Sequence, residues 1–129
     1  MLCSTFIIQI QPEFIPSKGG ETGWAKRHGY IRGWIKTGAD GTYTFYTTMP
    51  GAYPERNAAA HIHPTILEPD GKYYWVDEYL FKGDPLLTVQ QTSAASARGG
   101  NGAVITLEKQ GNLLVAKRDF VLGKNVPGY

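Results

Sequence analysis

The sequence predicts an all-β fold, an antiparallel β-sandwich, built as a single domain of 129 residues. Two observations support this fold class. Short runs rich in Val, Ile, Thr, Tyr and Phe have the composition that pleated strands favour. These runs are separated by many of the 16 glycines and eight prolines, which end strands and form turns. A chain of this length is of the usual size for one domain, and it contains no internal repeat.

The first half of the chain is expected to form four strands. Strands at residues 29–36 and 42–48 are joined by residues 38–41, where Asp40-Gly41 is a strong signal for a tight hairpin. A strand at 60–67 ends in a turn at 68–71, in which Pro69 suits the second turn position. Residues 72–76 then form the returning strand.

The second half is expected to contain shorter elements. Residues 77–81 form either a short helix or the end of a strand, and Gly83-Asp84-Pro85 stops either one. Residues 88–102 are small and polar, which indicates a loop or a weak helix. A last hairpin joins 103–109 to 113–122 through a turn at 110–112, and residues 123–129 form an irregular tail.

Charge and cysteine content exclude several classes of function. The 13 Lys and Arg residues are scattered along the sequence and are nearly balanced by 11 Asp and Glu residues, so nucleic acid is not an expected partner. Cys3 is the single cysteine, so an internal disulfide is excluded, and no paired Cys and His spacing indicates zinc. No apolar run approaches the roughly 20 residues of a membrane helix, so we expect no membrane partner. Residues 1–10 lack the features of a signal peptide, so we take them as mature sequence.

His61-Ile62-His63 is the first candidate for chemistry. Side chains of a strand alternate between its two faces, so both imidazoles point to one side and Ile62 points to the other. Two potential metal ligands therefore share one face. Taken alone, such a pair is as often a solvent-facing or hydrogen-bonded pair of histidines as a metal site.

Tyr53 precedes the histidine strand in a rigid turn, Met49-Pro50-Gly51-Ala52-Tyr53-Pro54. Phenolate is a hard anionic donor that favours a ferric ion, whereas imidazole also suits copper, nickel and zinc. Tyr53 together with His61 and His63 therefore indicates iron. By itself, a tyrosine in such a turn is more often a core or turn residue with a hydrogen-bonded hydroxyl.

Four runs carry a resemblance to a known family. They are Arg32-Gly33-Trp34-Ile35-Lys36-Thr37, Asp40-Gly41-Thr42-Tyr43-Thr44-Phe45, Thr48-Met49-Pro50-Gly51-Ala52-Tyr53-Pro54 and Ala60-His61-Ile62-His63. In order and spacing, these runs resemble the intradiol ring-cleavage dioxygenases of protocatechuate, catechol and hydroxyquinol. Residues 79–86 and 120–123 resemble two further segments of that family. The resemblance covers residues 19–129 and implies the catalytic core of a prealbumin-like β-sandwich.

The resemblance also implies a cofactor and a reaction. The cofactor is Fe(III), held by two tyrosinates, two histidines and a hydroxide, with Tyr53 and His63 matching the axial ligands and His61 an equatorial one. The substrates are a catechol and O2, and the product is a cis,cis-muconate type diacid. Tyr53 would leave the metal to take a proton. Arg56 matches an arginine that stabilises charge on the substrate, and a solvated arginine is an equally frequent alternative. Members of the family often form homo-oligomers, which implies the same for this chain.

Residues 1–18 depart from the family pattern. The second ligand tyrosine would fall at Phe14, which has no oxygen to offer a metal, so activity is expected to be impaired. A shifted reading of the codons for residues 6–15 can spell the tyrosine-containing motif of the family. We therefore hypothesise that a frameshift altered this atypical segment and removed an N-terminal portion.

Two alternatives stay open. The first is a non-catalytic, transthyretin-like or carbohydrate-associated β-sandwich that binds a ligand or a partner, and iron content distinguishes it from the enzyme. The second is a zinc or copper site of a hydrolase or cupin-like type, which would usually add an acidic ligand that this motif lacks.

Overall fold

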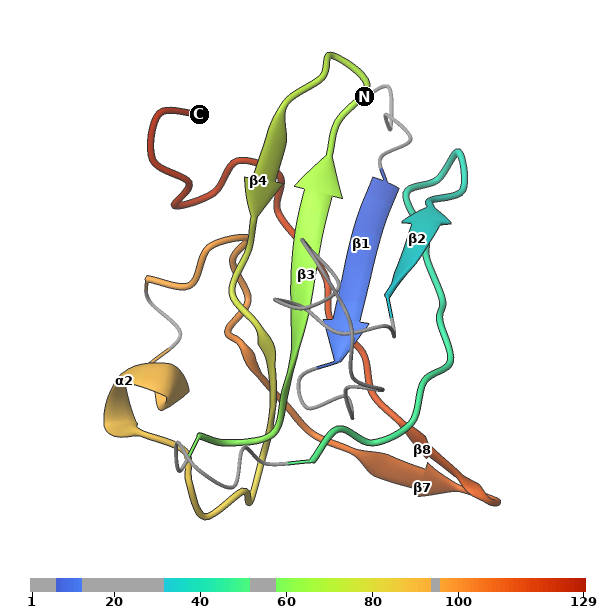
Figure 1. The fold of residues 1–129 in the computed structure, drawn as a ribbon, viewed down its shortest axis with the longest axis vertical. Helices are drawn as coiled ribbons and strands as arrows, with labels where there is room; N and C mark the ends of the chain where they lie inside the picture. The colour runs from blue at the N-terminus through green and yellow to red at the C-terminus, as the bar shows by residue number, and fades with distance from the viewer. Residues whose placement is uncertain (1–6, 13–31, 52–57, 94–95) are drawn as a thin grey trace, which may run out of the picture.

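The computed structural model describes residues 7–12, 32–51, 58–93 and 96–129. Strands and extended loops dominate these residues, and the helix α2 (Val89–Thr92) is only one turn long (Figure 1). The all-β prediction is therefore confirmed, whereas the prealbumin-like sandwich type stays a prediction. Among the described residues, no helical segment has the length and apolar character that a membrane crossing requires.

A six-stranded sheet forms the centre of the molecule. Its strands lie in the order β2-β1-β3-β5-β6, and β4 pairs with the other end of β3 on the same side as β5. The strands are β1 (Ile7–Pro12), β2 (Gly33–Lys36), β3 (His61–Leu67), β4 (Tyr73–Trp75), β5 (Tyr79–Phe81) and β6 (Val104–Ile105). A separate hairpin of β7 (Glu108–Gln110) and β8 (Leu113–Val115) extends from the sheet in Figure 1.

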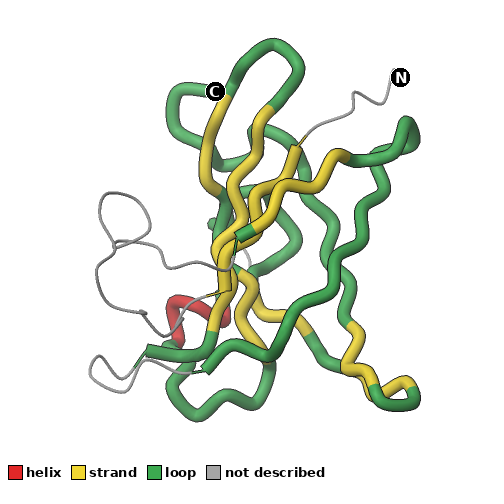
Figure 2. The backbone as a smooth tube through the Cα atoms, turned by 45° about the vertical axis from the view of Figure 1, so that its right-hand side comes forward, coloured by secondary structure: helices red, strands yellow, loops and turns green. Residues whose placement is uncertain are grey.

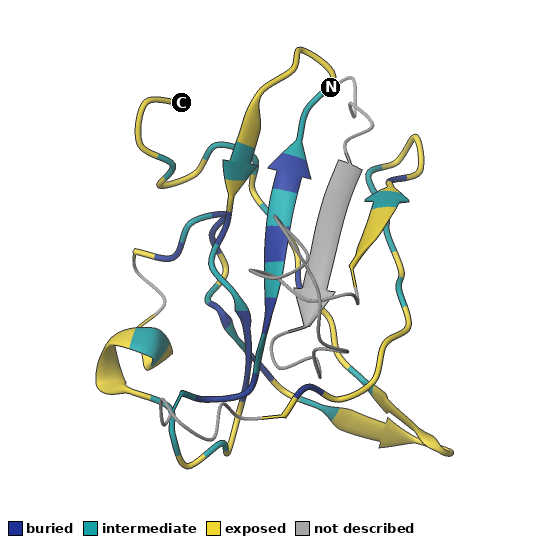
Figure 3. Ribbon diagram, in the orientation of Figure 1, coloured by how far each residue is buried: buried dark blue, intermediate teal, exposed yellow. Residues whose placement is uncertain are grey.

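The side chains of β3 alternate between a core face and an outer face of the sheet. Ile62, Pro64 and Ile66 are buried, and they alternate with half-buried residues, as Figure 3 shows. Aromatic and aliphatic side chains from extended segments pack against the core face, so the second layer consists largely of chain that forms no ladder. Figure 2 shows how much of the chain runs as loops beside the strands. These packing residues include Tyr43, Phe45, Leu107, Phe120 and Leu122.

The predicted strand at 42–48 is wrong as a paired strand. The turn before it forms as expected, because the Gly38 N–H donates to the Thr42 carbonyl and the Gly41 N–H donates to the Gly38 carbonyl. Burial still alternates along the segment, with Tyr43 and Phe45 the less exposed residues. These two rings pack across the core face of the sheet, so the segment crosses that face and forms no ladder with β2.

The last predicted hairpin forms around its predicted turn, where β7 pairs with β8, but its strands are shorter than predicted, and the antiparallel prediction also needs correction. β5 and β6 are parallel, with Leu80 paired to Val104, whereas the other strand pairs among the described residues are antiparallel. The predicted strand at 103–109 is divided into β6 and β7, which join different sheets. Leu107 lies between them and turns its side chain to the core. The predicted strand at 113–122 ends at Val115, and Phe120 then packs into the core instead.

Other local predictions are confirmed. The turn after β3 closes with the Gly71 N–H donating to the Glu68 carbonyl, at a positive φ of 89° that favours glycine. Of the two possibilities for residues 77–81, the strand end is correct, because β5 lies there. The weak helix is α2, which begins with a capping box formed by Thr88 and Gln91.

The strand opposite β3 contains a β-bulge between β4 and β5. Thr65 pairs with Trp75, and Ile62 pairs with Tyr79. Between these two pairs, β3 has residues 63 and 64, whereas the opposite strand has residues 76, 77 and 78. Three residues that oppose two define a bulge, which bends the strand and redirects its side chains.

Pro64 explains why the bulge lies at this point. The Pro64 carbonyl accepts a hydrogen bond from the Val76 N–H, so this edge of Pro64 faces the bulge. A proline has no N–H to donate in return. Arg118 supplies donors instead, because its Nη1 donates to the carbonyls of Asp77 and Glu78 at 2.7 and 2.8 Å. The bulge is therefore anchored from the core side of the sheet.

Candidate metal centre

His61 and His63 are the predicted site residues that the structure brings together. They begin β3, and their ring centroids are 4.7 Å apart with the ring planes at 87°. Ile62 between them is buried in the core. As strand alternation predicts, the two imidazoles therefore share the outer face of the sheet, which we call the histidine face.

The orientation of His61 is set by its own backbone. Its Nδ1 lies 2.6 Å from the carbonyl oxygen of Ala59, and a carbonyl can only accept a hydrogen bond. This contact assigns the proton to Nδ1, so coordination of a metal by His61 would use Nε2. Histidines that bind metals usually donate their other ring N–H to such an oxygen.

His63 has a carboxylate partner. Its Nδ1 lies 3.5 Å from Oε1 of Glu78, with the two side chains 39% and 36% exposed. The distance is longer than that of an ordinary hydrogen bond, so the carboxylate acts on the ring mainly through its negative charge. Both histidines therefore turn Nδ1 towards an oxygen, and a metal shared by the pair would be bound through Nε2.

Glu78 also lines a pocket on the histidine face. The pocket has a volume of about 180 Å³. Leu80 contributes to it, and Leu80 pairs with His61 across the sheet, which places both side chains on the same face. The lining is mostly polar: Asp77, Glu78, Leu80, Gln90, Gln91, Ser93, Ser96 and Ala103.

Glu78 was missed by sequence reasoning. The signal that points to it is Pro64 inside the predicted strand 60–67, since proline within a sheet is confined mainly to edges and bulges. A bulge beside His63 would have indicated that the residues opposite it are redirected. Which residue lies opposite His63 depends on the register of β3 with β4 and β5, and residue spacing alone does not define that register.

Tyr53 and Arg56, the other predicted site residues, lie outside the described residues, as does Phe14. Within the described ranges, no group of three or more His, Cys, Asp or Glu residues could hold a metal ion. The two imidazoles with their oxygen partners fit the histidine half of an iron site in donor type and orientation. The remaining ligands that the resemblance implies belong to other segments.

Two tyrosines close to β3 in the fold do not fit as the missing ligand. Tyr79 pairs with Ile62 and is buried, so its ring lies on the core face, opposite the histidines. Its hydroxyl contacts that of Tyr43 at 2.9 Å, and the Tyr43 hydroxyl donates to the Arg118 carbonyl. Burial raises the pKa of both tyrosines, which keeps them protonated in the core.

Comparison with known proteins supports the fold. No family model and no curated protein matches the sequence. A similar solved structure is the dioxygenase domain of a novel dioxygenase carbohydrate-binding protein fusion from the cellulolytic bacterium Streptomyces sp. SirexAA-E. The TM-score is 0.65 at 24% sequence identity, over 92% of this chain and 68% of that chain. The chain therefore has a dioxygenase-like fold.

Proposed function

We propose that this chain is an Fe(III)-dependent intradiol dioxygenase domain that uses O2 to open a catechol ring to a cis,cis-muconate type diacid. The observation that carries the proposal is the pairing of His61 and His63 on one strand face, each with Nδ1 turned to an oxygen. The dioxygenase-like fold supports it, as does the sequence resemblance around Tyr53.

Each site residue has a distinct role in this proposal. Bound iron would supply Lewis acidity and electronic activation of a catechol held at the site. His61 and His63 would hold the metal through Nε2. Tyr53 would serve as a ligand and as the base that takes a proton from the catechol. Arg56 stabilises negative charge on the substrate. The roles of Tyr53 and Arg56 rest on the sequence resemblance.

We further propose that residues 19–129 form the catalytic core and that residues 1–18 carry the altered sequence. β1 comes from this altered segment, yet it lies between β2 and β3 and pairs with both. Phe14 follows the end of β1 by two residues. With phenylalanine at this position, the site has one anionic donor fewer, and we expect weak ferric binding and impaired turnover.

Metal analysis with a visible spectrum tests the proposal. The purified chain, loaded with ferric iron, should bind it weakly with a faint tyrosinate-to-iron band. His61→Ala should abolish binding, whereas Phe14→Tyr should increase iron content and colour together. Thr65→Ala is the matched control, because Thr65 is the next half-buried residue after His63 on the same face of β3. Iron retention that is equal in His61→Ala and the unmodified chain would reject the enzyme and favour the non-catalytic binding module.

A further inference from the structure

The bulge determines where the side chain of Glu78 lies. Trp75 pairs with Thr65 on the histidine face, so strict alternation would place residue 77 on that face and residue 78 in the core. Instead Tyr79 pairs with the buried Ile62 and occupies the core. The extra residue has therefore shifted the alternation, and Asp77 and Glu78 both line the pocket on the histidine face.

Arg118 fixes the backbone from which Glu78 extends. The residue is 7% exposed, and its guanidinium carbon lies 4.9 Å from the ring centroid of Tyr79 and 4.7 Å from that of Phe120. Its two charge-assisted bonds go to the carbonyls of residues 77 and 78. The peptide groups at the bulge are thus held by a buried group, while the carboxylate beyond them stays partly exposed.

We propose that Glu78 is the positioning residue of His63: its carboxylate selects the tautomer that carries the proton on Nδ1 and directs Nε2 to the metal. This inference rests on the proposed function and adds a residue to its site. The supporting contact is the 3.5 Å approach of the Glu78 carboxylate to Nδ1. A pair this exposed contributes little to folding stability, so the contact matters for orientation.

The chemical consequence concerns ligand basicity and charge. A carboxylate beside one ring nitrogen increases the electron density that the other nitrogen offers to a metal. It also brings a negative charge next to a site that, by the sequence resemblance, has one tyrosinate fewer than the family. Glu78 therefore supports iron binding from outside the ligand set, and its removal should weaken affinity without displacing a ligand.

Nitrogen NMR of the metal-free protein tests the tautomer directly. At mildly alkaline pH, long-range proton–nitrogen spectra of a neutral imidazole show which ring nitrogen carries the hydrogen. The unmodified chain should show His63 with the proton on Nδ1, and Glu78→Ala should move the population towards the Nε2–H form. His61 is an internal control, because its partner is the Ala59 carbonyl. An unchanged His63 tautomer in Glu78→Ala overturns the inference, whatever the metal does.

Iron affinity, measured by competition with nitrilotriacetate, tests the consequence. Glu78→Ala should lower affinity by roughly 10 to 100-fold, the usual effect of losing a partner of a metal-bound histidine. Glu78→Gln should lose less, because its amide oxygen still accepts a hydrogen bond but carries no charge. Glu108→Gln is the control for charge, since Glu108 is exposed on β7.

The two measurements separate the inference from the proposed function. If the unmodified chain and all variants fail to bind iron, the proposed function fails, and the tautomer still decides whether Glu78 positions His63. If His61→Ala abolishes binding while Glu78→Ala and Glu78→Gln both match the unmodified chain, the enzyme proposal stands and the role of Glu78 is rejected. Should Glu78→Ala not fold, Glu78→Gln alone decides, and its affinity must fall below that of Glu108→Gln.

Discussion

The two ends of β3 each lie beside a glutamate, and the two carboxylates have different surroundings. After the last residue of β3, Glu68 Oε1 accepts hydrogen bonds from the hydroxyls of Tyr74 at 2.6 Å and Tyr129 at 2.8 Å. The Tyr129 hydroxyl also lies 3.1 Å from Oε2. At the first residues of β3, the Glu78 carboxylate lies 3.5 Å from Nδ1 of His63. One carboxylate is tightly hydrogen-bonded, and the other is loosely held.

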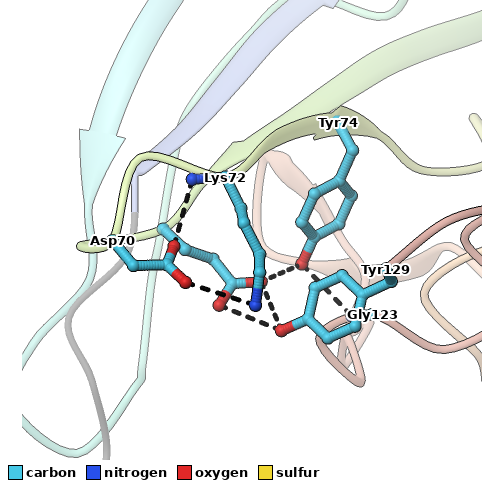
Figure 4. Close-up of polar contacts among 6 residues, drawn as sticks. Asp70, Lys72, Tyr74, Gly123 and Tyr129 are labelled. Carbon is cyan, nitrogen blue, oxygen red and sulfur yellow. Dashed lines mark hydrogen bonds and ion pairs between the residues drawn. The ribbon is translucent and has the colours of Figure 1, made fainter.

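The Glu68 end connects three parts of the chain. The Tyr74 hydroxyl accepts a hydrogen bond from the Gly123 N–H, and the rings of Tyr74 and Tyr129 meet edge to face at 5.6 Å. Lys72 lies 4.4 Å from the centroid of the Tyr129 ring and pairs with Asp70 (Figure 4). These contacts join the turn after β3 to the C-terminal tail, so the cluster is structural.

This comparison shows that the surroundings of a carboxylate decide whether it stabilises the fold or orients a neighbouring side chain. At the Glu68 end, short bonds from two hydroxyls leave little freedom, and the free energy of those bonds appears in stability. At the Glu78 end, the backbone is anchored by Arg118 while the side chain stays partly exposed. The second arrangement can orient a neighbouring imidazole while contributing little to the stability of the fold.

The largest effect is expected for Glu68→Ala, which removes the acceptor of two tyrosine hydroxyls. The partly buried Tyr74 hydroxyl then lacks the acceptor for its hydrogen, at a cost of about 1–3 kcal/mol. Unfolding in urea should show this loss, while the NMR spectrum of His63 stays unchanged. A change in the His63 tautomer would contradict the expectation that the two ends of β3 act independently. Glu108→Gln is the control for the loss of one exposed carboxylate.

A smaller effect is expected at alkaline pH. Burial raises the pKa of Tyr74 above its ordinary value, and the hydrogen bond to Glu68 raises it further. The pKa of Tyr129 is also raised, mainly by its hydrogen bond to Glu68. Below about pH 10 these tyrosines are protonated in both the folded and the unfolded chain, so their contribution to stability is complete. Above that pH the unfolded chain ionises first, and the contribution is lost as pH rises through the folded pKa.

Tyr74→Phe measures this contribution. The difference in free energy of unfolding between the unmodified chain and Tyr74→Phe should be constant below about pH 10 and should shrink above it. Urea unfolding at a series of pH values checks this. The same comparison in a Glu68→Ala background should give a smaller pH-dependent change, because one cause of the raised pKa has been removed. A difference that stays constant through the alkaline range would contradict the assignment.

Local chemistry was sufficient to predict several parts of the fold. Asp40-Gly41 and Pro69 mark turns because their backbone preferences act within four residues, and both turns form as predicted. The alternation of His61, Ile62 and His63 predicted the shared face of the two imidazoles, since it requires only that the segment is a strand. The histidine half of the candidate site was therefore accessible from the sequence.

Long-range pairing was the part that could not be predicted. The alternation at residues 42–48 is compatible with a ladder or with a segment that crosses the core face, and the packing of Tyr43 and Phe45 decides between them. The parallel pairing of β5 with β6 depends on residues more than twenty positions apart. Glu78 lies beside His63 because of a bulge, and the backbone of that bulge is held by Arg118, which is 40 residues away in the sequence. Tyr53 and Arg56 stay predictions.

The smallest change in stability is expected for Glu78→Ala. This variant tests most directly whether the two glutamates differ in their roles. The contact with His63 is longer than an ordinary hydrogen bond, and both side chains are more than a third exposed. Water screens such a pair, and holding two side chains in one geometry costs entropy, so its net contribution is between zero and about 1 kcal/mol. Removing the Glu78 carboxylate also leaves the two Arg118 bonds intact, because they go to backbone carbonyls. Urea unfolding of Glu78→Ala should therefore match that of Glu108→Gln closely, although its His63 tautomer differs. A loss of stability as large as that of Glu68→Ala would mean that Glu78 supports the fold, and the altered tautomer would then be a consequence of structural damage.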